Sequence, residues 1–293
     1  MAGLKEIRTR IASIKTTRQV TSAMKMVSAA KLKKAQDAIL QIRPYADKLH
    51  EILTSLSASL ENVEDSVYTQ NREPEEILIV LISSNRGLCG GFNTNISKKA
   101  IELVNTKYSR QMKLGQVEFI CVGKQGERQM KHRGMKVAGN KNDIFDMLTF
   151  ENVSEFAGEI MNAFSEKNYD RVEIVYNQFK NAAVQEQTTE QFLPVEIKEE
   201  DLNSNTNYDF IYEPSKEYIV KELIPRSLKI QLYKALLDSN AAEHGARMTA
   251  MHQATDNATE LLGELTLQYN KARQATITGE ILEIVSGAEA LKG

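Results

Sequence analysis

The chain has 293 residues, of which 42% are hydrophobic and 26% are charged, and its net charge is -2. This composition is typical of a folded globular protein and excludes a disordered or low-complexity chain. Two cysteines cannot form a disulfide framework, and they indicate a reducing compartment. The longest apolar run, Ile77–Ile82, is about a quarter of a membrane span, and Met1–Arg10 lacks the apolar core of a secretory signal. Any membrane association is therefore expected to come through a partner.

Charge is distributed unevenly along the chain. The first 40 residues hold nine basic and two acidic side chains, a net charge of +7, whereas the remaining residues carry -9. A basic segment on a mildly acidic body predicts an acidic partner for that segment. A solvated helix face explains the charge equally well, and the sequence leaves both interpretations open.

Residues 1–58 predict one long helix, because apolar residues recur at helical spacing. The stripe consists of Leu4, Ile7, Ile11, Ile14, Val20, Met24 and Val27. Pro44 is expected to bend this helix without ending it. About 55 helical residues would span about 80 Å, and a helix of that length needs a partner helix.

The C-terminal residues 211–293 supply the candidate partner. Their apolar and small residues alternate in steps of three and four, which is the pattern of a coiled-coil heptad. The seam consists of Met248, Met251, Thr255, Ala258, Leu262, Leu265, Tyr269, Ala272 and Thr276. Because several seam residues are small or polar, we expect close packing with modest stability per turn. One amphipathic helix folded onto an ordinary core is the alternative.

Residues 75–210 read as an α/β domain inserted between the two long helices. Strands are predicted at 76–82, 117–122 and 171–176, and helices at 96–110, 125–132 and 153–166. Alternation of strand and helix predicts a parallel sheet covered by helices. The expected fold is therefore a long antiparallel coiled coil of the N-terminal helix (1–58) and the C-terminal helix (211–293), with a Rossmann-like α/β domain (75–210) between them.

The residues offer little support for catalysis. The glycine-rich run 86–91 follows the first strand, where a nucleotide-binding loop would lie, but it matches neither G-x-G-x-x-G nor the P-loop. Cys89 and Cys121 have no histidine beside them in the sequence, and the separation of His244 from His252 does not fit a metal site. We expect no catalytic residues, no cofactor and no metal. A nucleotide-binding α/β enzyme remains the weaker alternative.

A basic coiled-coil protein that binds nucleic acid or acts as an adaptor is a second alternative. Nine basic side chains along one helix could follow a phosphate backbone. The same helix carries an apolar stripe, many small residues and no aromatic residue before Tyr45. Those features favour burial in a protein sleeve over binding to nucleic acid.

Four segments resemble the gamma subunit of the F-type ATP synthase of bacteria. They are MAGLKEIR with TSAMKMVSA near the N-terminus, SNRGLCGGFN after the first strand, ARMTAM with ATDNA in the last helix, and YNKARQATIT with EIVSGA near the end. They extend from one end of the chain to the other, so the probability that the similarity arose by chance is very small.

The resemblance implies a non-catalytic rotor shaft. In this family the two terminal helices turn inside a hexameric head of alpha and beta subunits, and the α/β domain lies with the epsilon subunit and the c-subunit ring. Ion flow turns the ring and the shaft, and ATP is made or hydrolysed by the beta subunits. The resemblance also implies a peripheral protein on the cytoplasmic face of the bacterial inner or plasma membrane.

The resemblance also implies contact residues. Those expected to meet the beta subunits are Met24, Lys25, Met26, Lys31, Lys33, Lys34, Arg273, Gln274 and Thr278. Packing between the two helices is the alternative for the two methionines, and it is favoured for Met26. Tyr212, Glu213 and Arg86 are expected at the end that meets the c ring and epsilon. The acidic, asparagine-rich segment 199–207 receives no role.

Overall fold

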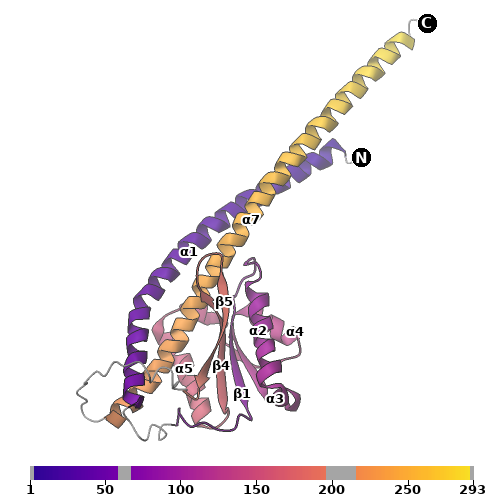
Figure 1. Ribbon diagram of the computed structural model, residues 1–293. Helices are drawn as coiled ribbons and strands as arrows, with labels where there is room; N and C mark the ends of the chain where they lie inside the picture. The colour runs from indigo at the N-terminus through magenta and orange to yellow at the C-terminus, as the bar shows by residue number, and fades with distance from the viewer. Residues whose placement is uncertain (1–2, 59–66, 196–215, 291–293) are drawn as a thin grey trace. The chain divides into compact units, whose positions relative to one another are not determined.

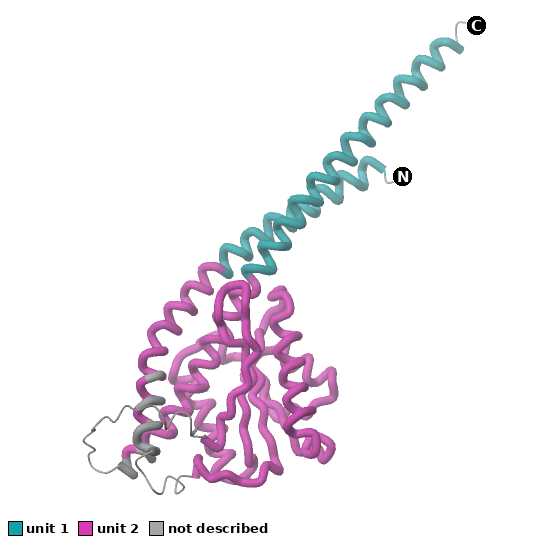
Figure 2. The backbone as a smooth tube through the Cα atoms, viewed as in Figure 1, with its two compact units in different colours: residues 1–28, 248–293 teal, residues 29–247 magenta. Residues whose placement is uncertain are grey.

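The computed structural model describes residues 3–58, 67–195 and 216–290. The chain forms two compact units, one made of residues 1–28 with 248–293 and the other of residues 29–247 (Figure 2). Both long helices contribute to both units: α1 spans Leu4–Ala58 and α7 spans Lys216–Ala290. Helical structure continues through Pro44 in α1 and through Pro225 in α7. No observation tests the expected limits of the three segments, which remain a prediction: 1–58, 75–210 and 211–293.

In the first unit, α1 and α7 run side by side (Figure 2). On α7 the residues of the expected seam from Met248 to Ala272 are all buried or half-buried, and Met251, Ala258 and Leu265 are buried. Thr255 Oγ1 lies 2.8 Å from Thr21 Oγ1 and joins the two helices. The three-four spacing therefore identified the packed face of α7 correctly, except at Thr276, which is exposed.

The expected apolar stripe of α1 is correct except at Val20 and Val27. A strict three-four row of buried or half-buried positions runs through Leu4, Ile7, Ile11, Ile14, Arg18, Thr21, Lys25 and Ser28, and Ser22 and Met24 beside it are also half-buried. Val20 and Val27 lie outside this face and are 52% and 58% exposed. The geometry of helix pairing sets the face, so polar side chains occupy it while two valines remain in solvent.

The second unit contains a five-stranded sheet with the order β3-β2-β1-β4-β5 (Figure 1). The strands are β1 (Ile77–Ile82), β2 (Val117–Val122), β3 (Lys136–Asn140), β4 (Arg171–Phe179) and β5 (Gln185–Leu193). The first four are parallel, and β5 pairs antiparallel with β4. The expected parallel sheet is therefore confirmed for β1–β4, and β5 adds an antiparallel edge because a short turn after β4 returns the chain directly.

The helices cover both faces of this sheet (Figure 1). They are α2 (Phe92–Lys107), α3 (Ser109–Leu114), α4 (Lys124–His132) and α5 (Phe150–Ser165), with the short helix η2 (Asn142–Phe145). Side chains alternate across β1: Ile77, Ile79 and Leu81 pack with α2 and α4, whereas Leu78, Val80 and Ile82 pack with α5 and α7. This alternation explains why an unbroken apolar run forms the central strand.

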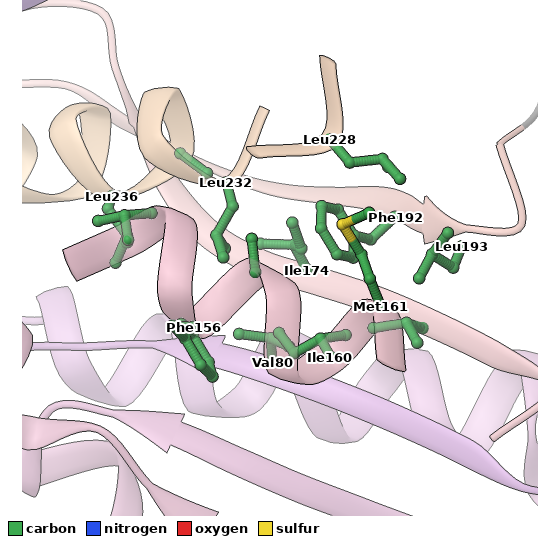
Figure 3. Close-up of a cluster of buried hydrophobic side chains, with 14 of the residues drawn as sticks. Val80, Phe156, Ile160, Met161, Ile174, Phe192, Leu193, Leu228, Leu232 and Leu236 are labelled. Carbon is green, nitrogen blue, oxygen red and sulfur yellow. The ribbon is translucent and has the colours of Figure 1, made fainter. Parts of the chain in front are cut away.

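The lower part of α7 belongs to the core of the second unit. Ile224, Leu228, Leu232 and Leu236 recur every four residues and pack with Phe156 and other apolar side chains of α5 and the sheet (Figure 3). The N-terminal part of the helix expected over 211–293 is therefore integral to the α/β core.

Candidate partner-binding surfaces

The C-terminal end of α7 presents apolar side chains to solvent. Every residue of the described part after Gly279 is exposed, and the large apolar ones are Ile281, Leu282, Ile284 and Val285, with Ile284 71% exposed. Ile277 is also exposed. Such a group of apolar residues on a helix marks a surface that a partner covers. The sequence reasoning missed this group, although the apolar residues after Thr276 no longer follow the three-four seam.

Arg273, Gln274 and Thr278 lie on the same stretch of α7, and all three are exposed. On α1, the side chains of Met24 and Lys25 are half-buried, whereas Met26 is 64% exposed. Packing between the helices is thus not the role of Met26, contrary to the alternative favoured from the sequence. Thr255, which contacts Thr21, precedes Arg273 by about 27 Å of helix, so the expected contact residues form two groups at different levels of the first unit.

In the second unit, Lys31, Lys33 and Lys34 are exposed on α1. Lys33 Nζ lies 2.8 Å from the carboxylate of Asp37, one turn further along the helix. An exposed ion pair of this kind contributes little stability, so all three ammonium groups remain accessible to an acidic partner. Tyr212 and Glu213, and the segment 199–207, lie outside the described residues.

Arg86, the last expected contact residue, belongs to the glycine-rich loop that follows β1. Its side chain is exposed, but its backbone carbonyl accepts a hydrogen bond from Arg247 Nη2 at 3.2 Å. Arg247 Nε donates to the carbonyl of Gly87 at 3.4 Å, and Arg247 Nη2 lies 2.7 Å from the carboxylate of Glu243. Glu243 and Arg247 are both buried. A buried ion pair on α7 thus anchors the loop, an arrangement that the sequence reasoning did not find.

The loop is also held from its other side. Asn93, the second residue of α2, accepts a hydrogen bond from the Ser84 backbone N–H at 3.0 Å, and its amide donates to Ser84 Oγ at 2.8 Å. Cys89 Sγ lies 3.2 Å from the same amide. Burial raises the pKa of the Cys89 thiol, which keeps it protonated. Burial likewise raises the pKa of Cys121 to about 12. Both cysteines are packing residues, and neither is an activated nucleophile.

Close backbone approach explains two glycines in this region. Gly123, at the start of α4, has a positive φ of 112°, and a Cβ there would lie 2.5 Å from the Ser83 carbonyl oxygen. A Cβ on Gly245 of α7 would lie 3.3 Å from the backbone of Ala182. Glycine therefore lets α7 lie directly against the turn between β4 and β5, next to Glu243 and Arg247.

The described residues contain no cluster of three or more His, Cys, Asp and Glu that could hold a metal ion. His244 is half-buried, and burial, with Arg247 and Lys31 nearby, lowers its pKa to about 4. His252 is exposed and lies 3.3 Å from Asp256. Among the residues that the structure describes, no helix combines the length and the apolar character that crossing a membrane requires.

A helix pair made from both ends of the chain, with an inserted α/β domain, is a fold found in the central stalks of rotary ATP synthases. A chain in the mitochondrial ATP synthase of Euglena gracilis matches with a TM-score of 0.68 and 22% identity, over 98% of this chain and 94% of that one. A chain in the rotor of the same enzyme matches with a TM-score of 0.66 and 23% identity, over 94% and 98%.

Sequence comparison gives the family itself. The ATP synthase family model matches residues 3–291. The ATP synthase gamma chain of Flavobacterium psychrophilum is 56% identical over 293 residues and 100% of both chains. That of Cytophaga hutchinsonii is 54% identical over 295 residues and 99% of both chains. The chain belongs to the ATP synthase gamma chain family, which confirms the resemblance seen in its sequence.

Proposed function

We propose that this chain is the central rotor shaft of an F-type ATP synthase. It couples ion flow through a membrane c ring to ATP synthesis or hydrolysis at the beta subunits of the catalytic head. The observation that carries the proposal is the full-length match to gamma chains at up to 56% identity, together with a helix pair whose apolar residues face outward.

The outward-facing residues support a protein sleeve around the first unit. Val20, Met26 and Val27 on α1 and Ile281 and Ile284 on α7 expose apolar surface that a lone protein would bury. The apolar character of these residues favours a protein partner over a phosphate backbone. The alpha and beta subunits of the head are the partners that we assign to this surface.

The chain acts without catalytic residues, cofactor or metal of its own. The glycine-rich loop is anchored by Arg247, whose guanidinium binds the carbonyls of Arg86 and Gly87, and carbonyl groups turned toward an arginine do not form an anion site. We assign the epsilon subunit and the c ring to contacts with Arg86, Tyr212 and Glu213. Membrane association then arises only through the complex, on the cytoplasmic face of a bacterial membrane.

Weak contacts suit a shaft that turns. An exposed lysine paired with an acidic group contributes about 0–1 kcal/mol, so Lys31, Lys33 and Lys34 guide the rotor without fixing it at one angle. Arg273 is suited to a directional hydrogen bond with a carboxylate near the end of the shaft.

Co-expression with alpha and beta subunits of a close relative tests the proposal. A purified complex should hydrolyse ATP, steady turnover should require this chain, and the chain alone should hydrolyse nothing. A chain that ignores both partners, or that binds nucleotide or nucleic acid by itself, would overturn the assignment.

A further inference from the structure

A buried carboxylate in the second unit has no hydrogen-bond donor in the part of the chain that the structure describes. The side chain of Asp238, on α7, is 0% exposed, and neither of its oxygens has a hydrogen-bond partner among the described residues. The cation paired with Asp238 is Arg43 of α1, and its Nη2 lies 3.9 Å from Asp238 Oδ1. Burial of an ionised carboxylate without donors is costly, so the protonation of this group and the packing around it are coupled.

The groups that face Asp238 come from every element packed around it. Arg43 approaches from α1, Tyr176 from β4, Glu190 from β5 and Lys180 from the turn after β4, while Lys234 lies one turn earlier on α7. The best donors are engaged elsewhere: Tyr176 Oη donates to Glu190 Oε1 at 2.6 Å, and Gln231 Nε2 donates to Glu190 Oε2 at 3.3 Å. Asp238 therefore receives long-range attraction from cations but no direct hydrogen bond.

The α1 segment that supplies Arg43 is the weak part of the enclosure. Pro44 has no backbone N–H, so one helical hydrogen bond is missing beside Arg43. The side chain of Leu40 is 64% exposed, whereas Ile39 and Leu49 are buried. The Arg226 guanidinium of α7 lies 5.6 Å from the centre of the Tyr45 ring. Arg43 and Tyr45 are exposed, and their contacts with α7 involve the charged groups of Asp238 and Arg226.

We propose that Asp238 is a proton-operated latch for the part of α1 around Arg43. With a neutral carboxyl, α1 stays closed over the site. With an ionised carboxylate, a conformation in which residues 39–49 of α1 open enough to hydrate Asp238 gains population. The latch thereby links pH to the closure of α1 over Asp238 within the second unit, a regulation that goes beyond the rotor role.

The direction of the pH effect on opening follows from proton linkage. Burial raises the pKa of Asp238 from 3.8 to about 6 in the closed state, against the pull of Arg43 and Lys234. In an open, hydrated state the pKa returns toward its ordinary value, so the closed state binds the proton more tightly. Raising the pH from 5 to 7 then increases the equilibrium constant for opening about tenfold.

Hydrogen exchange of the full chain, followed by mass spectrometry on peptides covering residues 36–46, tests the latch. After correction for intrinsic exchange rates, protection should fall about tenfold between pH 5 and pH 7. Asp238→Asn should stay protected at pH 7 and show no pH dependence. Asp37→Asn, which changes an exposed acid on the same helix, is the matched control and should behave like the unmodified chain.

Arg43→Gln provides a second test that leaves the core intact, because this side chain is partly exposed. Without the arginine the ionised carboxylate is less favoured in the closed state, so the pKa of Asp238 there rises further. Exchange at pH 7 should then be larger than in the unmodified chain, and the change in protection between pH 5 and pH 7 should exceed about tenfold. Protection that does not change with pH in the unmodified chain, or an unchanged pH response in either Asp238→Asn or Arg43→Gln, would overturn the proposal.

Discussion

Arg247 and Glu243 form a buried ion pair one helical turn apart on α7, with 2.7 Å between Arg247 Nη2 and Glu243 Oε1. The same guanidinium binds the carbonyls of Arg86 and Gly87 in the loop after β1. A pair that only held the helix together would lie on its surface. This one ties the last turns of α7 in the second unit to the loop after β1.

Removing the arginine is therefore expected to destabilise the chain strongly. Arg247→Ala leaves Glu243 buried without its partner, and breaking a buried pair in this way costs about 3–5 kcal/mol. Thermal unfolding of the full chain, followed by circular dichroism, measures the loss. Lys33→Ala breaks the exposed pair with Asp37 and should change stability by less than about 0.5 kcal/mol. Equal effects of the two substitutions would show that the buried pair has no special role.

The pH dependence of stability should contain a contribution from His244. Its pKa is lowered from 6.5 to about 4 in the folded chain, so the unfolded chain takes up a proton first as pH falls. The stability linked to this residue is present above pH 6.5 and is lost as pH falls toward 4. The loss amounts to at most about 3 kcal/mol.

Comparing the unmodified chain with His244→Gln isolates the contribution of His244 to the free energy of unfolding. The difference in their free energies of unfolding should change between pH 6.5 and pH 4 and be constant above pH 6.5. Denaturant titrations across this range measure it, and His252→Gln, at an exposed position, is the control. A difference that stays constant across the whole range would contradict the buried environment of His244.

Much of the fold could be predicted from the sequence because strong patterns determine it. The run Ile77–Ile82 is the central strand, and the three-four spacing of 248–272 marks the packed face of α7. The strand β5 escaped prediction because QEQTTEQFL is mostly polar and lies at an edge of the sheet. The strand β3 escaped because KVAGN is short and contains glycine.

The contact surfaces were harder to predict, because exposure depends on the partner helix. Val20 and Val27 continue an apolar pattern in the sequence, yet the geometry of pairing places Thr21 and Ser28 against α7 instead. The role of Arg247 was equally hidden, since its bonding partners Arg86 and Gly87 are some 160 residues away in the sequence. Long-range pairing of this kind leaves no periodic signal.

The basic side chains of α1 should have a modest and salt-dependent effect. Replacing Lys31, Lys33 and Lys34 by Gln removes three exposed charges, each contributing about 0–1 kcal/mol to contact with an acidic partner. Assembly with alpha and beta subunits should persist, with the ATPase rate of the complex changed by a small factor. The difference from the unmodified complex should vanish in high salt, where such charges are screened. Complete loss of assembly would show that these lysines form a fixed attachment.

The end of α7 should affect coupling more than stability. Arg273 and Gln274 are exposed on a stretch of helix that α1 does not bury, so replacing both by Ala should leave the thermal unfolding of the chain unchanged within about 0.5 kcal/mol. In the assembled enzyme the same change removes a directional hydrogen bond to the head, and proton pumping per ATP hydrolysed should fall. Proton uptake and phosphate release, measured on the same vesicles, give this ratio. Gln253→Ala with Glu260→Ala, at exposed positions earlier on α7, is the control. An unchanged ratio in the Arg273 and Gln274 variant would remove these residues from the contact surface.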